Sequence, residues 1–121
     1  MAATDPPSLF SVELRTTRWT ELVAWYRGVL GLPVLVRVVD DGYALFAAGD
    51  TRLAILQRPA AAPASPRWSL GFEVPDLDAV RERLVRSGAD VAAATANPEG
   101  FRECVVTDPD GNRIRLFAWP T

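Results

Sequence analysis

The order of the elements predicted along the chain occurs twice, and this duplication limits the possible folds more than any other feature. Residues 9–58 read as a strand, an amphipathic helix and three strands, and residues 67–118 repeat that order. A half of about 60 residues does not easily bury enough apolar surface to be stable by itself. We therefore predict an α+β fold in which two βαβββ modules form one cupped, mixed β-sheet, with the helices on its convex side.

In the first half, the spacing of apolar residues changes from that of a strand to that of a helix. Residues 9–16 alternate between apolar and polar side chains, and the next apolar residues recur every three or four positions. These helical positions are Trp19, Leu22, Val23, Tyr26 and Val29. Thr17 is predicted to cap the helix and Gly31 to end it. The strands that follow are predicted at 33–40, 43–49 and 51–58.

A stretch rich in proline and alanine, residues 59–66, separates the halves and reads as a linker. We therefore expect a single domain at 9–118, made of module one (9–58), this linker and module two (67–118).

In the second half, a strand is predicted at 68–74 and a helix follows it. Asp76 is a suitable N-cap for this helix, and Gly88 a suitable end. A tight turn at Asp108–Asn112 joins the last two strands. The remaining strands are predicted at 89–96, 101–107 and 112–118.

The chain contains no histidine and one cysteine, Cys104, among its 121 residues. Catalytic triads that need histidine, and zinc sites built on histidine or several cysteines, are therefore excluded. A bound metal would need oxygen ligands. The single cysteine also excludes an intrachain disulfide, and with an N-terminal stretch unlike a signal peptide it favours a cytoplasmic location.

The charge and hydropathy of the chain exclude two further classes of partner. The formal net charge is −2, so no strongly basic surface is expected for nucleic acid. No apolar run approaches the roughly 18 residues that a membrane-spanning helix needs. We therefore predict neither a nucleic-acid nor a membrane partner.

Three segments resemble the vicinal oxygen chelate superfamily, which includes glyoxalase I, extradiol dioxygenases, fosfomycin-resistance enzymes and bleomycin resistance proteins. The first helix of that family is similar to LVAWYRGVLGLPV (22–34). Its fifth strand and second helix resemble LGFEVPDLDAVRERLVRSGADV (70–91), and its last hairpin resembles NPEGFRECVVTDPDGNRIRLF (97–117). The resemblance implies the cupped fold, but not one activity, because this fold hosts many.

In metal-dependent members of that family, four inward-facing side chains on the first and fourth strands of each half bind a divalent ion. The matching positions here are Ser11, Ala54, Ser69 and Arg115, with Leu56 as an alternative to Ala54. None is a suitable metal ligand, and the positive charge of Arg115 would repel a divalent ion. We therefore predict no metal and no cofactor, and the non-catalytic bleomycin resistance proteins become the nearer analogy.

Arg115 stands in the middle of a strand whose neighbours are apolar. Ile114 and Leu116 are predicted to face the helices, so Arg115 faces the concave side together with Arg113 and Phe117. A charge in a cavity needs a partner, and Glu13 and Glu73 are at suitable positions. Three interpretations remain open. The pair fills the former metal site, Arg115 also binds a carboxylate, phosphate or carbonyl of a ligand, or Arg115 is simply exposed to solvent.

Other residues are candidates for the wall of the same cavity. Trp68 and Trp119 could form a stacking surface or simply pack, and Glu103 is expected near the cavity mouth. The complete set of predicted cavity residues is Ser11, Glu13, Ala54, Trp68, Ser69, Glu73, Glu103, Arg113, Arg115 and Trp119. No catalytic residue is assigned.

The interpretation that fits these residues is a metal-free small-molecule-binding protein that sequesters an antibiotic or a secondary metabolite. One alternative is a metal-dependent lyase or dioxygenase with other ligands, or a metal-free enzyme with Glu13 or Glu73 as base. Another is a packing or partner module without a pocket. The habit of the family, the many aromatic residues and the length of the linker favour a homodimer.

Overall fold

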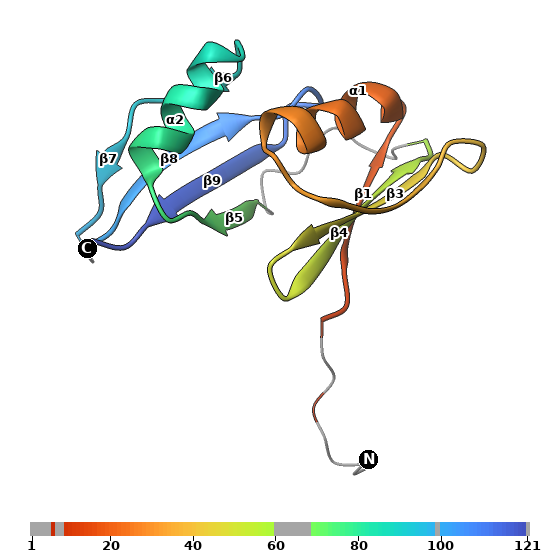
Figure 1. The fold of residues 1–121 in the computed structure, drawn as a ribbon, viewed down its shortest axis with the longest axis horizontal. Coiled ribbons are helices and arrows are strands. Elements are labelled where there is room, and N and C mark those ends of the chain that lie inside the picture. Colours follow the sequence, from red (N-terminus) through yellow and green to blue (C-terminus); the bar gives the residue numbers. More distant parts are fainter. Residues whose placement is uncertain (1–5, 7–8, 60–68, 99, 121) are drawn as a thin grey trace.

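The computed structural model describes residues 6, 9–59, 69–98 and 100–120. Within these residues, two modules lie side by side, each with a β-sheet and a helical region (Figure 1). The predicted α+β class and the doubled βαβββ order are confirmed. Trp68 and most of the predicted linker lie outside the described residues. The described helices are too short or too polar to cross a membrane.

Module one contains one sheet and one helical region. Its strands are β1 (Val12–Thr16), β2 (Val34–Val38), β3 (Tyr43–Ala48) and β4 (Thr51–Gln57). They lie in the order β1-β4-β3-β2, with β1 parallel to β4 and the other pairs antiparallel. Between β1 and β2 the chain forms α1 (Trp19–Ala24), which continues directly into the π-helical segment η1 (Trp25–Val29).

Module two has the same plan with one irregularity. Its elements are β5 (Leu70–Glu73), α2 (Leu77–Arg86), β6 (Asp90–Val91), β7 (Thr95–Ala96), β8 (Arg102–Thr107) and β9 (Arg113–Ala118). The sheet order is β5-β9-β8-β6, and β7 also pairs with β8. The strand predicted at 89–96 is thus divided in two. The alanines 92–94 between the pieces offer little side-chain surface to pack on a sheet.

Each module has its own sheet, whereas a single continuous sheet was predicted. In the described part of the chain, no strand of one sheet pairs with a strand of the other, and β1 and β5 are each at an edge. The hydrogen bonds that join the modules come instead from the helical side. They link Arg18 to Pro109, Tyr26 to Asp108 and Arg83 to Leu30.

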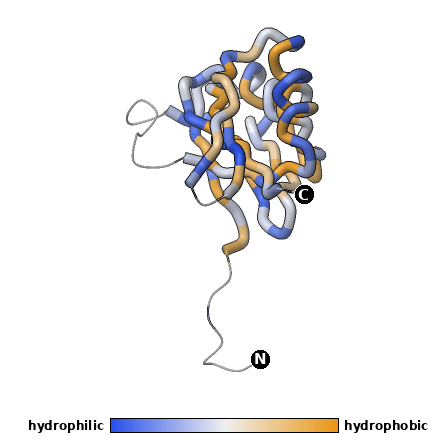
Figure 2. Tube along the Cα trace, turned by 90° about the vertical axis from the view of Figure 1, so that its left-hand side faces the viewer, coloured by the Kyte–Doolittle hydropathy of each residue, from blue (hydrophilic) through white to orange (hydrophobic). Residues whose placement is uncertain are grey.

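A single hydrophobic core lies between the helices and the inner faces of both sheets. Apolar and polar residues alternate along the helices, so one side of each helix can be buried (Figure 2). Fully buried side chains from both modules are Leu22, Tyr26, Phe46, Ile55, Leu84, Val106, Ile114 and Leu116. The convex sides of both sheets therefore face this common core, and their concave sides lie away from it.

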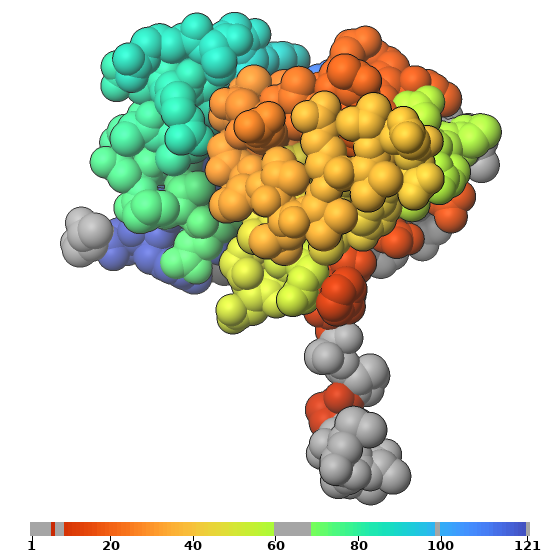
Figure 3. Space-filling view, turned by 45° about the vertical axis from the view of Figure 1, so that its right-hand side comes forward, coloured from red at the N-terminus to blue at the C-terminus, as the bar shows by residue number. Residues whose placement is uncertain are grey.

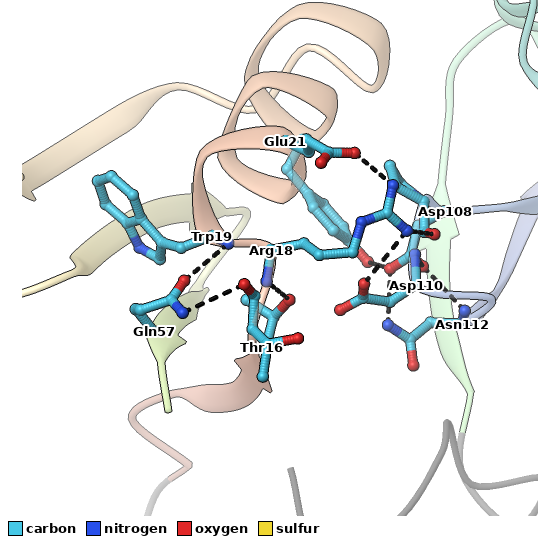
Figure 4. A network of polar contacts seen from close by, with 11 residues as sticks. Thr16, Arg18, Trp19, Glu21, Gln57, Asp108, Asp110 and Asn112 are labelled. Atoms are coloured by element: carbon cyan, nitrogen blue, oxygen red, sulfur yellow. Dashed lines mark hydrogen bonds and ion pairs between the residues drawn. The ribbon is translucent and has the colours of Figure 1, made fainter. Parts of the chain in front are cut away.

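The start of α1 differs from the prediction. The N-cap residue is Arg18 and not Thr17, and its side chain makes no capping hydrogen bond. Thr16 Oγ1 accepts a hydrogen bond from the Arg18 N–H, and Gln57 Oε1 accepts one from the Trp19 N–H, both at 2.9 Å (Figure 4). Because Gln57 ends β4, a residue remote in sequence satisfies the first turn of the helix.

The other predicted helix ends are confirmed. Asp76 is the N-cap of α2, and its Oδ1 accepts a hydrogen bond from the Ala79 N–H at 3.0 Å. Gly31 and Gly88, which follow the two helical regions, have φ angles of 85° and 78°. Residues other than glycine rarely adopt this conformation, so these positions end the helices as their residue type indicates.

The π-helical segment brings two successive aromatic residues into the core. A π turn holds more residues than an α turn, which changes the direction of the side chains that follow it. Trp25, which is not part of the predicted apolar stripe, is only 8% exposed, and Tyr26 is fully buried. Their rings meet edge to face with centroids 4.9 Å apart. Tyr26 lies on the apolar stripe that the helical spacing predicts, and its hydroxyl faces module two.

Tyr26 and Asp108 form a buried hydrogen bond between the modules. The Tyr26 hydroxyl donates to Asp108 Oδ2 at 2.7 Å. The same carboxylate accepts the backbone N–H groups of Asp110 and Asn112 and the side-chain amide of Asn112, at 2.8–2.9 Å. On the surface beside it, the Arg18 guanidinium donates to the Pro109 carbonyl at 2.6 Å. Asp108 therefore organises its own turn and also anchors the first helical region.

Replacing Tyr26 with Phe should lower the free energy of unfolding by about 1–3 kcal/mol, because the buried Asp108 carboxylate loses a donor. Tyr43→Phe is the matched control, since the Tyr43 hydroxyl has no hydrogen-bond partner among the described residues. It should change stability by less than about 0.5 kcal/mol. Urea denaturation measures both variants, and equal losses would show that the Tyr26 bond is not stabilising.

The stability of wild type and that of Tyr26→Phe should depend differently on pH above about pH 10. Burial, and then the negative charge of Asp108, raise the pKa of Tyr26 far above its ordinary value. A tyrosine in the unfolded chain ionises near about pH 10, so wild-type stability should fall as the pH rises above that value. Burial also raises the pKa of Cys104. A cysteine in the unfolded chain ionises at a lower pH than a tyrosine does, so the loss of stability that Cys104 causes begins at a lower pH. Tyr26→Phe should remove only the fall above pH 10; an unchanged slope would contradict this.

Candidate functional site

Alternate residues of β9 face opposite sides of its sheet, as predicted. Ile114 and Leu116 are fully buried against the helices. Arg113 is exposed, and Arg115 and Phe117 are half-buried. The latter three therefore project from the side away from the core, which we call the concave face of module two.

The strand registers show that Ala54 and Arg115 are at equivalent positions of the two modules. Glu13 of β1 lies beside Ala54 of β4 in a parallel pair. Gly71 of β5 lies beside Arg115 of β9 in the same kind of pair. The duplication is thus preserved in the register, while one copy carries a methyl group and the other a guanidinium.

Arg115 pairs with Glu103, and not with Glu13 or Glu73 as predicted. Arg115 Nη1 lies 3.4 Å from Glu103 Oε2, and the two side chains are 38% and 24% exposed. Glu103 of β8 and Glu73 of β5 lie on opposite sides of Phe117, so both are diagonal neighbours of Arg115. The register permits either partner, and the structure selects the one on β8.

Three aromatic side chains, Phe101, Phe117 and Trp119, gather beside this ion pair and form what we call the aromatic cluster. Their rings meet edge to face, with centroid distances of 5.3–5.9 Å. The Arg115 guanidinium lies over the rings of Phe117 and Phe101, at 5.3 and 5.8 Å from their centroids. Phe101 is buried, whereas Trp119 is 54% exposed. The concave face of module two therefore combines a cation, a carboxylate and an accessible aromatic surface.

The concave face of module one is chemically different. Val36 and Val38 of β2 pair with Leu45 and Tyr43 of β3, and Tyr43 also pairs with Leu56 of β4. Val36 and Val38 remain 44% and 38% exposed. β2 and the turn after it lie at the molecular surface (Figure 3). The part of this face that Val36, Val38, Leu45 and Leu56 form is therefore aliphatic, whereas Glu13 and Arg15 of β1 and Arg52 of β4 project from the same side.

Hollows lined by described residues also lie elsewhere on the molecule. One of about 350 Å³ lies between the start of α2 and the end of β9 and is lined by Asp76, Asp78, Arg102 and Trp119. A second, of about 240 Å³, lies between the modules, and a third, of about 440 Å³, adjoins the turn after β2. The first hollow borders Trp119, so the aromatic cluster adjoins open space on that side.

Comparison with known proteins decides the family. The model of the Glyoxalase/Bleomycin resistance protein/Dioxygenase superfamily matches residues 8–116. This chain belongs to that superfamily. No curated protein sequence matches it.

Several solved structures share the fold of this superfamily member. A glyoxalase family protein from Bacillus anthracis is 22% identical, with a TM-score of 0.80 over 98% of this chain and 100% of that one. The antibiotic binding protein TnmS3 from Streptomyces sp. CB03234 is 21% identical, with a TM-score of 0.77 over 95% and 98%. A lactoylglutathione lyase from Agrobacterium tumefaciens is 20% identical, with a TM-score of 0.74 over 93% and 94%. At these identities the comparisons establish the fold alone.

The positions that the superfamily resemblance assigns to a metal do not fit one here. They provide two hydroxyls, a methyl group and a guanidinium, from Ser11, Ser69, Ala54 and Arg115. Shifting the third position to Leu56 gives another apolar side chain. Among the described residues, no three His, Cys, Asp or Glu side chains cluster as ligands would. The residue set therefore lacks the donors for a divalent ion and adds a fixed positive charge.

The structure brings some of the predicted cavity residues together and separates others. Glu103, Arg115 and Trp119 are joined through the ion pair and the aromatic cluster, and Arg113 projects from the same face. Glu73 of β5 lies beside Phe117 on that face but does not pair with Arg115. Ser11, Glu13 and Ala54 belong to module one, Ser69 lies just before β5, and Trp68 is outside the described residues.

Two aromatic residues of the site, Phe101 and Phe117, were not among the predicted cavity residues. Phe117 could have been included, because it alternates in phase with Arg115 along β9. Phe101 could also have been included, because it is in phase with Glu103 in the strand predicted at 101–107, although β8 itself begins at Arg102. The burial of Phe101 beside Phe117 follows only from the folded positions of the two segments.

Replacing Glu103 with Gln should change the free energy of unfolding by less than about 1 kcal/mol, because a partly exposed ion pair is screened by water. Glu82→Gln is the matched control, since Glu82 and Arg86 form an exposed pair with the same 3.4 Å separation. Urea denaturation of both variants tests this. A loss of about 3 kcal/mol for Glu103→Gln alone would show that Arg115 and Glu103 act as a buried structural pair.

Proposed function

We propose that this superfamily member is a metal-free protein that binds a small molecule, with the concave face of module two as the main binding surface. The observation that supports this most directly is the position of Arg115. A guanidinium stands where a metal-dependent relative would hold a ligand of its ion, and it lies against aromatic rings. Arginine beside aromatic surface suits a flat, largely apolar molecule that carries an oxyanion or carbonyl.

Sequestration is the biological role that we propose for this binding. The antibiotic binding protein TnmS3 has the same fold, at 21% identity. Among the described residues of the concave face of module two, no group is arranged as a nucleophile with its base, and Glu103 is engaged with Arg115. A surface that holds a molecule without transforming it would protect a cell from an antibiotic or store a secondary metabolite.

We further propose that the protein acts as a homodimer that completes the cup. Within one chain the two concave faces lie away from the common core, and β1 and β5 are sheet edges. Unpaired edges and exposed aliphatic side chains such as Val36 and Val38 favour association. Pairing of the β1 edge of one chain with the β5 edge of another would set an aliphatic wall opposite the aromatic cluster.

Ligand binding should persist after dialysis against a chelator. Native mass spectrometry of untagged protein with a library of antibiotics and metabolites should yield a bound molecule and no stoichiometric divalent metal. Trp119→Ala should lose the bound species, because an accessible part of the aromatic surface is removed. Val85→Ala, at an exposed position of α2, should retain it. A stoichiometric metal would favour the lyase or dioxygenase alternative, and no bound molecule from a broad library would favour the packing module.

The dimer should be visible in solution. Sedimentation velocity at micromolar concentration should give a species of twice the chain mass, because closing the cup removes exposed apolar surface from water. Small-angle X-ray scattering on the same sample should give a compact particle. A clean monomer across the micromolar range would contradict the homodimer and would leave the binding surface of module two open to solvent.

A further inference from the structure

Module two contains two arginine–carboxylate pairs that differ in geometry. Arg102 donates two hydrogen bonds to Asp78, at 2.9 and 3.0 Å, one to each carboxylate oxygen. Arg115 has a single contact with Glu103, at 3.4 Å. Charge-assisted pairs of the first kind are the strong ones, whereas 3.4 Å is long for an ionised donor and acceptor. The Arg115 pair is therefore the looser of the two, and it is the one on the concave face.

The loose pair leaves hydrogen-bonding capacity on Arg115. A guanidinium carries five N–H donors, and Glu103 Oε2 is the one acceptor of Arg115 among the described residues. The same oxygen also accepts a hydrogen bond from the Asn97 side-chain amide, at 3.4 Å. Arg115 is 38% exposed, so a molecule on the concave face can reach it. An incoming planar oxyanion could form the two parallel hydrogen bonds that Glu103 does not.

The aromatic cluster indicates what such a molecule would carry beside its oxyanion. The ring planes of Phe117 and Trp119 meet at 89°, and Trp119 is 54% exposed. A ligand ring that stacks on Trp119 would meet Phe117 edge to face, the arrangement that aromatic rings prefer. The Arg115 guanidinium carbon lies 5.3 Å from the centroid of the Phe117 ring. That span suits an aromatic ring that bears its acid group directly or through a short link.

The charges on this face favour a carboxylate over a phosphate. Glu73 and Glu103 flank Phe117 on the neighbouring strands, and Arg113 and Arg115 are the cations of the same face of β9. Two carboxylates near the site repel a doubly charged phosphate more than a singly charged acid. The shape of the guanidinium suits both groups, so the surrounding charge decides between them.

We propose that the ligands of this protein are aromatic carboxylic acids and that Glu103 is an internal stand-in for the ligand carboxylate, which the ligand displaces from Arg115. This inference rests on the proposed binding function and specifies its ligand class. Glu103 keeps Arg115 compensated in the empty site and competes with the ligand in the filled one. This competition predicts the direction of a change in affinity. Removal of the negative charge of Glu103 should strengthen the binding of an acid.

The test uses 2-naphthoic acid and its neutral amide, 2-naphthamide, titrated calorimetrically into the full-length protein. Wild type should bind the acid more tightly than the amide. Glu103→Gln should bind the acid more tightly than wild type, on the order of fivefold, which corresponds to the modest strength of a partly exposed ion pair. Its affinity for the amide should be unchanged. Glu82→Gln, which removes a carboxylate outside the site, should match wild type with both probes.

Two variants of Arg115 complete the design. Arg115→Met should bind the acid no better than the amide, and Arg115→Lys, which keeps the charge but loses the planar fork, should fall between it and wild type. Circular dichroism confirms that each variant is folded. Equal wild-type affinity for acid and amide, or no gain from Glu103→Gln, would overturn the inference and leave the binding function intact. If wild type binds neither the acid nor the amide, the inference is also overturned. The proposed binding function itself would be overturned only if the library screen also yields no bound molecule.

Discussion

The hydrogen bond from Tyr26 to Asp108 is the contact on which the arrangement of the two modules depends. Asp108 is a buried carboxylate, and such a group is costly unless donors surround it. Two of its donor residues belong to its own turn, and the third is the tyrosine of the other module. The turn that begins the arginine-bearing strand is therefore held in one geometry with the first helical region. This arrangement joins the modules through their helical sides and directs both concave faces outward.

The comparison of the two modules shows which features of a duplicated fold persist and which diverge. Both modules have apolar residues at their equivalent buried positions, because Ile55 and Leu116 pack into one core from opposite modules. The register also persists, because Ala54 and Arg115 keep the same parallel neighbour position. The concave side is free of that packing constraint, and there the copies differ most. One face has aliphatic side chains on β2 and β3 and scattered charges on β1 and β4, while the other gathers a guanidinium, a carboxylate and three aromatic rings. Among the described residues, the aromatic cluster and its ion pair are therefore found in one copy and not in the other.

Properties that depend on neighbours in sequence were predictable, and those that depend on distant partners were not. The alternation along β9 identified the side on which Arg115 lies, and Asp76 identified the start of α2, because both signals are local. The partner of Arg115 could not be identified, since Glu73 and Glu103 both adjoin Phe117 and differ only in the strand that carries them. The start of α1 was wrong for a similar reason, because Gln57 replaces the local cap from another strand. The separation of the sheets likewise arises from contacts between modules.

The π-helical segment Trp25–Val29 bears on how this chain can change length during evolution. A π turn is an α turn with one added residue, and it usually arises by a single insertion that leaves both flanks helical. Deleting one residue beyond Tyr26 would restore an ordinary helix with little rotation of its flanks, because the widened turn is what absorbs that residue. Deleting Tyr26 itself would remove the hydroxyl donor of the carboxylate in the other module. Relatives that keep this tyrosine–aspartate pair should therefore differ in helix length beyond the tyrosine and not at it.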